Sequence, residues 1–108
     1  MSIDIPGVAH EYFTLANAFD ADGTAALFAD EATVTDEGQT IRGREAIHAW
    51  ITRTMREFSA TAAPQRVDVL DGVVAVTAVV SGRFPGSPVP LTFRFTAADN
   101  HIAGLEIR

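Results

Sequence analysis

The chain has 108 residues, of which 47% are hydrophobic, and a formal net charge of −6 at pH 7. This length predicts one domain, residues 1–108, whose core needs neither a disulfide nor a metal. Cysteine and lysine are both absent, which excludes thiolate nucleophiles and Schiff-base chemistry on lysine. The acidic balance and the lack of a basic stripe argue against nucleic acid and anionic membranes as partners.

A first helix is predicted from about residue 6 to residue 20, with Pro6 in its first turn. Tyr12 falls on the apolar stripe of this helix, so its hydroxyl should need a partner. Either it is a core tyrosine bonded to backbone or water, or its phenol serves a ligand. The stripe recurs at helical spacing and comprises Val8, Tyr12, Leu15, Ala16 and Phe19.

The following segment breaks this helix and predicts a short second helix over residues 24–29, capped by Asp22. Asp20, Asp22 and Glu31 also have the spacing of a calcium-binding loop. However, Ala25 stands at the sixth position of that loop, where the turn requires glycine. We therefore reject calcium here, and the sequence predicts neither a metal nor a cofactor.

Asp36 follows a short run of strand-forming residues, Thr33, Val34 and Thr35, and Gly38 supplies a turn residue just beyond it. A carboxylate at the end of a strand is either solvated or aimed into a cavity by the scaffold. The local sequence leaves both interpretations open. Residues 40–42 are predicted to return as a second short strand.

A third helix is predicted from Arg44 to about Phe58, opened by Gly43. Trp50 lies on its inward stripe and is either a core residue or the wall of a pocket. The histidines lie on helix flanks and in a turn, without the spacing of metal ligands. The inward stripe comprises Ile47, Trp50, Ile51, Thr54 and Phe58.

From residue 65 onward the pattern changes to strands separated by turn signals such as Asp71-Gly72. The predicted strands, residues 65–70, 73–84, 89–97 and 101–108, form an antiparallel meander. Residues 73–80 are apolar on both faces, and one face must meet the helices. We expect a second copy of the chain to cover the outer face, giving a homodimer.

This order of elements predicts an α+β fold with three N-terminal helices packed in a cone on a curved sheet. The sheet should be mainly antiparallel, with four to six strands. An apolar cone of this kind is a default site for a small hydrophobic molecule. The sequence shows neither a stretch long enough to span a membrane nor a signal-peptide pattern, so we expect a cytoplasmic protein.

Three stretches resemble a known superfamily: residues 19–30, residues 32–36, and residues 43–47 together with Trp50. They are similar to the nuclear transport factor 2-like superfamily, which includes SnoaL-like proteins and ketosteroid isomerases. The resemblance implies that Asp36 matches the general base of the isomerases. It also implies that Tyr12 matches the phenol that hydrogen-bonds the enolate oxygen. The second donor of those enzymes, an acid, corresponds here to Leu91 or Thr92, so the resemblance implies an incomplete oxyanion hole.

These observations leave three hypotheses. In the first, Asp36 and Tyr12 carry out proton transfer on a hydrophobic carbonyl compound in an apolar pocket. In the second, the cone is a ligand-binding or dimerisation module without catalysis. In the third, the protein catalyses a reaction with water, as epoxide hydrolases of this superfamily do. Such a reaction needs an arginine inside the cone, whereas strand alternation predicts that Arg94 faces away from Phe93 and Phe95. The residues predicted to line the pocket are Phe28, Trp50, Leu91, Phe93 and Leu105.

Overall fold

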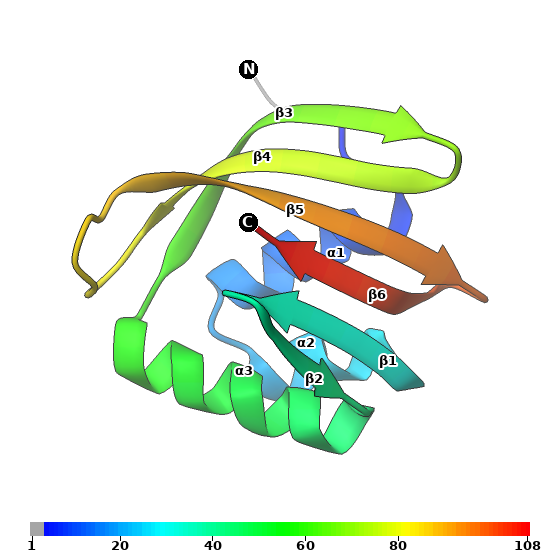
Figure 1. Cartoon of the computed structure of the whole chain (residues 1–108), viewed down its shortest axis with the longest axis horizontal. Coiled ribbons are helices and arrows are strands. Elements are labelled where there is room, and N and C mark those ends of the chain that lie inside the picture. The colour runs from blue at the N-terminus through cyan, green and yellow to red at the C-terminus, as the bar shows by residue number, and fades with distance from the viewer. Residues whose placement is uncertain (1–3) are drawn as a thin grey trace.

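The computed structural model describes residues 4–108, and its helices and strands follow the predicted order (Figure 1). The helices come before and between the first strands, and a meander of long strands completes the chain. The elements are α1 (Gly7–Asn17), α2 (Ala21–Ala26), β1 (Phe28–Asp36), β2 (Gln39–Arg42), α3 (Arg44–Phe58), β3 (Thr61–Leu70), β4 (Val73–Ser81), β5 (Val89–Ala98) and β6 (His101–Ile107).

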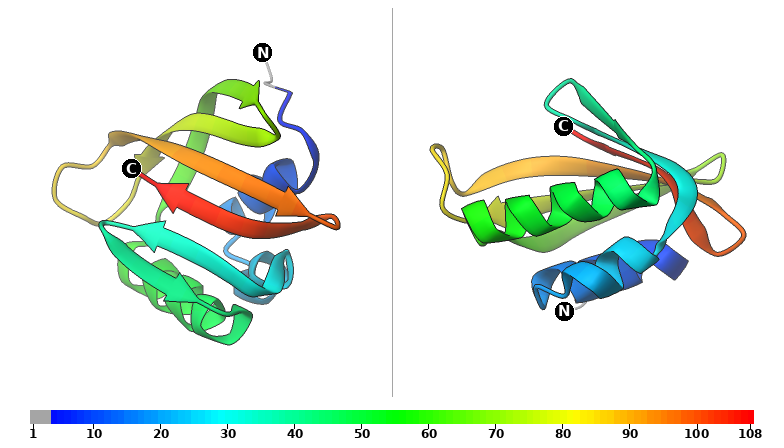
Figure 2. Two further views of the ribbon diagram at one scale, coloured as in Figure 1. Left: turned by 45° about the vertical axis from the view of Figure 1, so that its right-hand side comes forward. Right: turned by 90° about the horizontal axis from the view of Figure 1, so that it is seen from below.

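The strands form one sheet of six in the order β2-β1-β6-β5-β4-β3. Only β1 and β6 run parallel to each other, and the other neighbours are antiparallel. The three helices lie on one side of this curved, open sheet (Figure 2). The predicted α+β class, the cone of three helices and the mainly antiparallel sheet are therefore confirmed.

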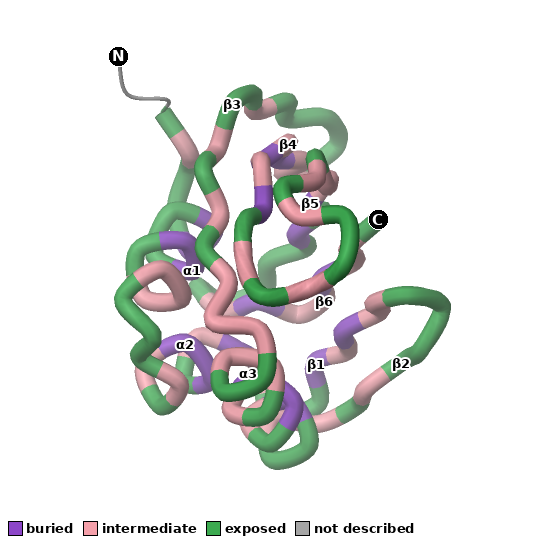
Figure 3. Tube along the Cα trace, turned by 90° about the vertical axis from the view of Figure 1, so that its left-hand side faces the viewer, coloured by how far each residue is buried: buried purple, intermediate pink, exposed green. Residues whose placement is uncertain are grey.

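The core lies between the helices and the inner face of the sheet. Buried and half-buried positions alternate over residues 32–35 of β1 and residues 75–80 of β4, as expected for strands with one face on a core (Figure 3). Among the described residues, no helix is long and apolar enough to cross a membrane. The largest side chains sealed in the core are Phe28, Phe95, Ile47, Ile102, Val34 and Val76.

The first helix is shorter than predicted, which changes its buried face. It ends at Asn17, and Phe19 follows with φ of 58°, outside the helix and 47% exposed. Phe13, which the predicted stripe omitted, is buried in its place. Asn17 ends α1 because its side-chain amide bonds both the N–H and the C=O of Ala62 at the start of β3, each at 2.8 Å.

Four other boundaries also differ from prediction. Asp20, not Asp22, caps the second helix, since its carboxylate accepts a hydrogen bond from the Gly23 N–H. That helix ends before Phe28, which begins β1. The third strand starts at residue 61 rather than 65 because its pairing with β4 continues past an irregularity at Pro64. The fourth strand ends at Ser81 rather than 84, where Gly82 packs on the end of α3.

Candidate functional site

Asp36 is held on the inner face of the sheet by strand parity. It shares a face with Ala32 and Val34, both of which are buried, and it pairs with Ile107 on β6. The strand ends there because Glu37 and Gly38 both take positive φ and form the turn to β2. Burial, and then the neighbouring charge of Glu37, raises the pKa of Asp36 above its ordinary value. The carboxylate is therefore half-buried and more basic than a solvated aspartate.

Tyr12 projects from α1 into a cluster of aromatic rings. Its ring centroid lies 5.3 Å from those of Phe13 and Phe95, 6.3 Å from that of Phe28 and 6.2 Å from that of Phe93. Three of these contacts are edge-to-face, the favoured geometry for aromatic pairs. The ring is therefore fixed from several sides, and the direction of its hydroxyl is fixed with it.

The Tyr12 hydroxyl has no hydrogen-bond partner among residues 4–108. In the same part of the chain, no fully buried side-chain oxygen or nitrogen lacks a partner. The hydroxyl must therefore reach space that water or a ligand can occupy. Among residues 4–108 no backbone group bonds the phenol, so of the interpretations that the sequence left open, a core tyrosine bonded to water and a phenol that serves a ligand remain.

The two polar groups are close enough to interact electrostatically. Burial raises the pKa of Tyr12, and the negative charge of Asp36 raises that pKa further. The strand register explains the proximity: Asp36 pairs with Ile107, Ile107 pairs with Phe93, and the Tyr12 ring packs on Phe93. Asp36 and Tyr12 thus flank one apolar row of the sheet, formed by Ile107 and Phe93. Because its pKa is raised, the Tyr12 hydroxyl remains protonated at neutral pH and can donate a hydrogen bond.

The residues predicted to line the pocket differ in burial. Trp50, Phe93 and Leu105 are nearly buried, and Leu91 is half-buried. Phe28 has no exposed surface, so it belongs to the packed core and meets a ligand only if its neighbours move. The indole N–H of Trp50 also lacks a partner among the described residues, yet it is not sealed. Sequence reasoning treated Trp50 as an apolar wall and missed this donor.

Among the described residues, the side-chain contacts of the arginines lie away from the row of Ile107 and Phe93. Arg94 lies near Glu106, at 3.9 Å, on the opposite face, as its strand parity predicted. Arg44 bonds the Phe28 carbonyl and pairs with Asp30 at 3.0 Å. His48 pairs with Asp22 at 2.7 Å, outside the cone. Within residues 4–108, no group of three or more potential ligands is arranged to hold a metal.

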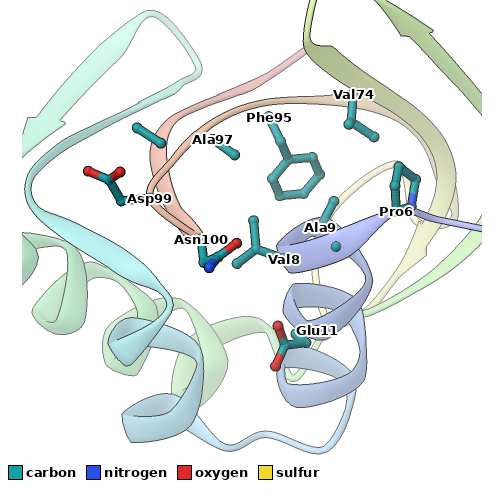
Figure 4. Close-up of a pocket in the computed structure, with 11 residues that line it drawn as sticks. Pro6, Val8, Ala9, Glu11, Val74, Phe95, Ala97, Asp99 and Asn100 are labelled. Atoms are coloured by element: carbon teal, nitrogen blue, oxygen red, sulfur yellow. The ribbon is translucent and has the colours of Figure 1, made fainter.

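Three hollows open elsewhere on the molecule. One of about 520 Å³ lies between the start of α1 and the β5–β6 turn, walled by Val8, Val74 and Phe95 (Figure 4). A second of about 820 Å³ is bordered by α2, α3 and His101, and a third of about 370 Å³ lies along Thr33, Arg94 and Glu106. Asp36 and Tyr12 line none of these three hollows.

This fold agrees with the comparison with known families. The profile of the SnoaL-like domain matches residues 9–104, so the chain belongs to the SnoaL-like family. The suspected superfamily, nuclear transport factor 2-like with ketosteroid isomerase-like members, is thereby confirmed. No curated protein matches the chain.

Solved structures extend the comparison. The chain is similar to a Sinorhizobium meliloti protein provisionally named a polyketide cyclase, with 41% identity, a TM-score of 0.94, and coverage of 100% of this chain and 99% of that one. It is also similar to a Sphaerobacter thermophilus protein, with 30% identity, a TM-score of 0.78, and coverage of 94% and 91%. A Catenulispora acidiphila protein with a ketosteroid isomerase-like fold, solved with trimethylamine, shares 20% identity, with a TM-score of 0.84 and coverage of 97% and 86%. The last likeness shows the fold alone.

Proposed function

We propose that this SnoaL-like protein catalyses proton transfer on a hydrophobic carbonyl compound, with Asp36 as the base and Tyr12 as the hydrogen-bond donor. One observation carries the proposal: a half-buried carboxylate and a phenol without a protein partner lie within electrostatic reach of each other. Groups with shifted pKa values in an apolar recess are typical of acid–base sites. The 41% identity to a protein provisionally named a polyketide cyclase is compatible with carbonyl chemistry.

In the proposed reaction, Asp36 takes a proton from the carbon next to the carbonyl group. The electron pair of that C–H bond becomes the C=C bond of an enolate, and negative charge develops on the carbonyl oxygen. Tyr12 donates its hydroxyl hydrogen bond to this oxygen, where a preorganised donor contributes most. Asp36 then returns the proton to another carbon of the substrate, so the net reaction is an isomerisation. The raised pKa of Asp36 brings its basicity nearer to that needed at neutral pH.

The test is the conversion of a β,γ-unsaturated ketone to its conjugated enone, followed by ultraviolet absorbance. Asp36→Asn should lower kcat/KM by at least about 10²-fold, because an amide cannot accept the proton. Asp68→Asn is the matched control, since Asp68 is an exposed carboxylate on the edge strand β3 that pairs only with Arg66. Equal turnover by the Asp36→Asn variant and the wild type would refute the proposal.

A second candidate function is ligand binding without chemistry, with Asp36 recognising a hydroxyl or an amine. Among residues 4–108 the Asp36 carboxylate has no ion-pair partner, and such a group would suit an ammonium ion. The Catenulispora acidiphila protein of the same fold was solved with trimethylamine. Calorimetry separates the two candidates: in this second case, compounds bind in a manner dependent on Asp36 and are recovered unchanged from the wild-type protein.

We also propose that the chain forms a homodimer through the outer face of the sheet. Arg94 and Glu106 lie on that face with Arg108, and a two-fold axis can place each charge opposite its complement in the second copy. Light scattering on the wild type should give twice the monomer mass. Arg94→Glu, which sets two acids side by side, should shift the equilibrium to monomer. A monomeric wild type would contradict this proposal.

A further inference from the structure

We propose that the hollow between the start of α1 and the β5–β6 turn is a second binding site, which takes a small aromatic amine. Asp36 and Tyr12 do not line this hollow, so the inference goes beyond the proposed function. It follows from an apolar row of the sheet that the helices leave partly uncovered, from the size of the hollow, and from the charges at its border.

A second apolar row on the inner face of the sheet extends beyond the cover of the helices. The strand register aligns this row from β6 across to β3, and its members are Leu105, Phe95, Val74 and Val69. Leu105 and Phe95 are buried, whereas Val74 is half-buried and Val69 is 60% exposed. Phe95 and Val74 both line the hollow. The hollow therefore opens at the point where this row leaves the core.

The hollow has the size and the wall of a small-ligand site. Its volume of about 520 Å³ lies within the range of about 300–1,000 Å³ that is typical of ligand pockets, and about 150 Å³ is enough for one benzene ring. The ring of Phe95 and the side chains of Val8 and Val74 lie on its wall (Figure 4). Phe95 is held by edge-to-face contacts with Tyr12 and Phe13, so this wall is preformed. The hollow therefore offers apolar contact to an aromatic ring.

The charges at the border of the hollow are negative. Among the described residues that line it, the charged ones are Glu11 and Asp99, and both are exposed. No ion pair within residues 4–108 engages either carboxylate. The first turn of α1 also lines the hollow and carries about half a positive elementary charge, which two full negative charges outweigh. The border therefore favours an ammonium group over a carboxylate.

The turn that carries Asp99 has a fixed backbone. Asp99 and Asn100 take positive φ of 52° and 62°, as the two central residues of the tight turn between β5 and β6. The Asp99 carbonyl accepts a hydrogen bond from Nδ1 of His101 at 2.9 Å. Both polar side chains at this border therefore extend from a backbone that is set before a ligand arrives.

The probe is 2-phenylethylamine, an ammonium ion at pH 7, compared with 2-phenylethanol and 3-phenylpropionate. Binding is followed by the amide chemical shifts of the isotope-labelled protein, because ligands this small bind with a Kd on the order of 1 mM. The amine should shift the amides of Val74, Ala97 and Asn100 in a saturable way. Exposed ion pairs are weak, so the alcohol should bind about three- to tenfold more weakly than the amine, and the carboxylate more weakly still.

Variants test the wall and the border separately. Ala97→Leu places a larger side chain in the hollow and should weaken the amine at least about tenfold, with Ala97→Val as the milder variant if the first does not fold. Ala63→Leu is its matched control, since Ala63 is an exposed alanine of β3 that lines none of the three hollows. Glu11→Gln should weaken the amine about two- to fivefold and leave the alcohol unchanged. Glu57→Gln, at an exposed position of α3 outside the hollows, should change neither.

The outcomes separate this site from the one proposed at Asp36. Shifts at the three amides that persist in Asp36→Asn and are lost in Ala97→Leu support the inference. Amine binding that disappears in Asp36→Asn and is unaffected by Ala97→Leu would place the ligand at Asp36 and overturn it. Tighter binding of 3-phenylpropionate than of the amine would show that the start of α1 selects the ligand, which also overturns it. The absence of saturable shifts with all three probes rejects the site, while the turnover assay tests the proposed function independently.

Discussion

Replacing Tyr12 by phenylalanine separates the role of its hydroxyl from the role of its ring. The ring contacts with Phe13, Phe28, Phe93 and Phe95 persist in the variant. The hydroxyl has no partner among the described residues, so its removal leaves no protein group unsatisfied. We therefore expect the free energy of unfolding to change by less than about 0.5 kcal/mol. For a domain of this size the melting temperature would shift by less than about 4 °C.

The same substitution should have a large effect on turnover. A hydrogen bond to a developing oxyanion typically contributes a factor of about 10²–10³ in kcat, or about 2.7–4 kcal/mol. The loss in activation free energy should therefore exceed the loss in stability several-fold. The assays are urea unfolding by circular dichroism and enone formation by absorbance, both on the same preparations.

Thr14→Val is the matched control for this experiment. It deletes a hydroxyl from the same helix, one that donates to the His10 carbonyl on the exposed side. Turnover should be unchanged in that variant. If Tyr12→Phe instead costs about 1–3 kcal/mol of stability, the value for leaving a buried partner unsatisfied, the phenol is bonded within the core and our reasoning is refuted.

Three further predictions concern the same site. Because burial raises the pKa of Asp36, the folded state favours the protonated carboxyl group. The stability that this group contributes is therefore fully present below its unfolded pKa of about 3.9, and it is lost as the pH rises through the folded pKa. Asp36→Asn should therefore unfold at higher urea than the wild type at pH 7 and equally at about pH 3; a less stable variant at pH 7 would contradict this. Glu37→Gln removes a like charge that raises the pKa of Asp36, so the acid limb of the kcat/KM profile should move to lower pH, and a shift upward would count against the assignment. Phe95→Ala should cost about 3–5 kcal/mol of unfolding free energy in urea, since the ring is buried against Tyr12, and a loss below about 1.5 kcal/mol would mean that the aromatic cluster is not packed as described.

The inner position of Asp36 was predictable because strand periodicity is strict. Once Val34 is assigned to the core, Asp36 must share its face, and Glu37-Gly38 ends the strand immediately afterwards. The long α3 helix was predictable for a similar reason, since its apolar stripe has a clear helical period. Arg94 was assigned to the outer face by parity with Phe93 and Phe95, whereas the local sequence alone left the orientation of Asp36 open.

Other features depend on tertiary contacts that no local pattern encodes. Phe13 and Phe19 both looked compatible with a helix face, and the choice between them depends on where the Asn17 side chain ends α1 by binding Ala62. Phe28 was predicted to lie in the second helix but begins β1, because its burial comes from β6 and the aromatic cluster. The indole N–H of Trp50 has no partner among the described residues because of three-dimensional packing, which no local pattern of the sequence shows.

The proposed function depends on Asp36 and Tyr12 lying close enough for the charge of the carboxylate to act on the phenol. Tyr12 is the only tyrosine in the chain, so the phenolate absorbance in an alkaline titration reports on this residue alone. The native protein should titrate above the ordinary tyrosine pKa of about 10, with circular dichroism confirming that it remains folded. Asp36→Asn should lower that pKa, because it removes the negative charge that opposes phenolate formation, whereas Asp68→Asn should leave it unchanged. An identical Tyr12 pKa in the wild type and in Asp36→Asn would contradict the account.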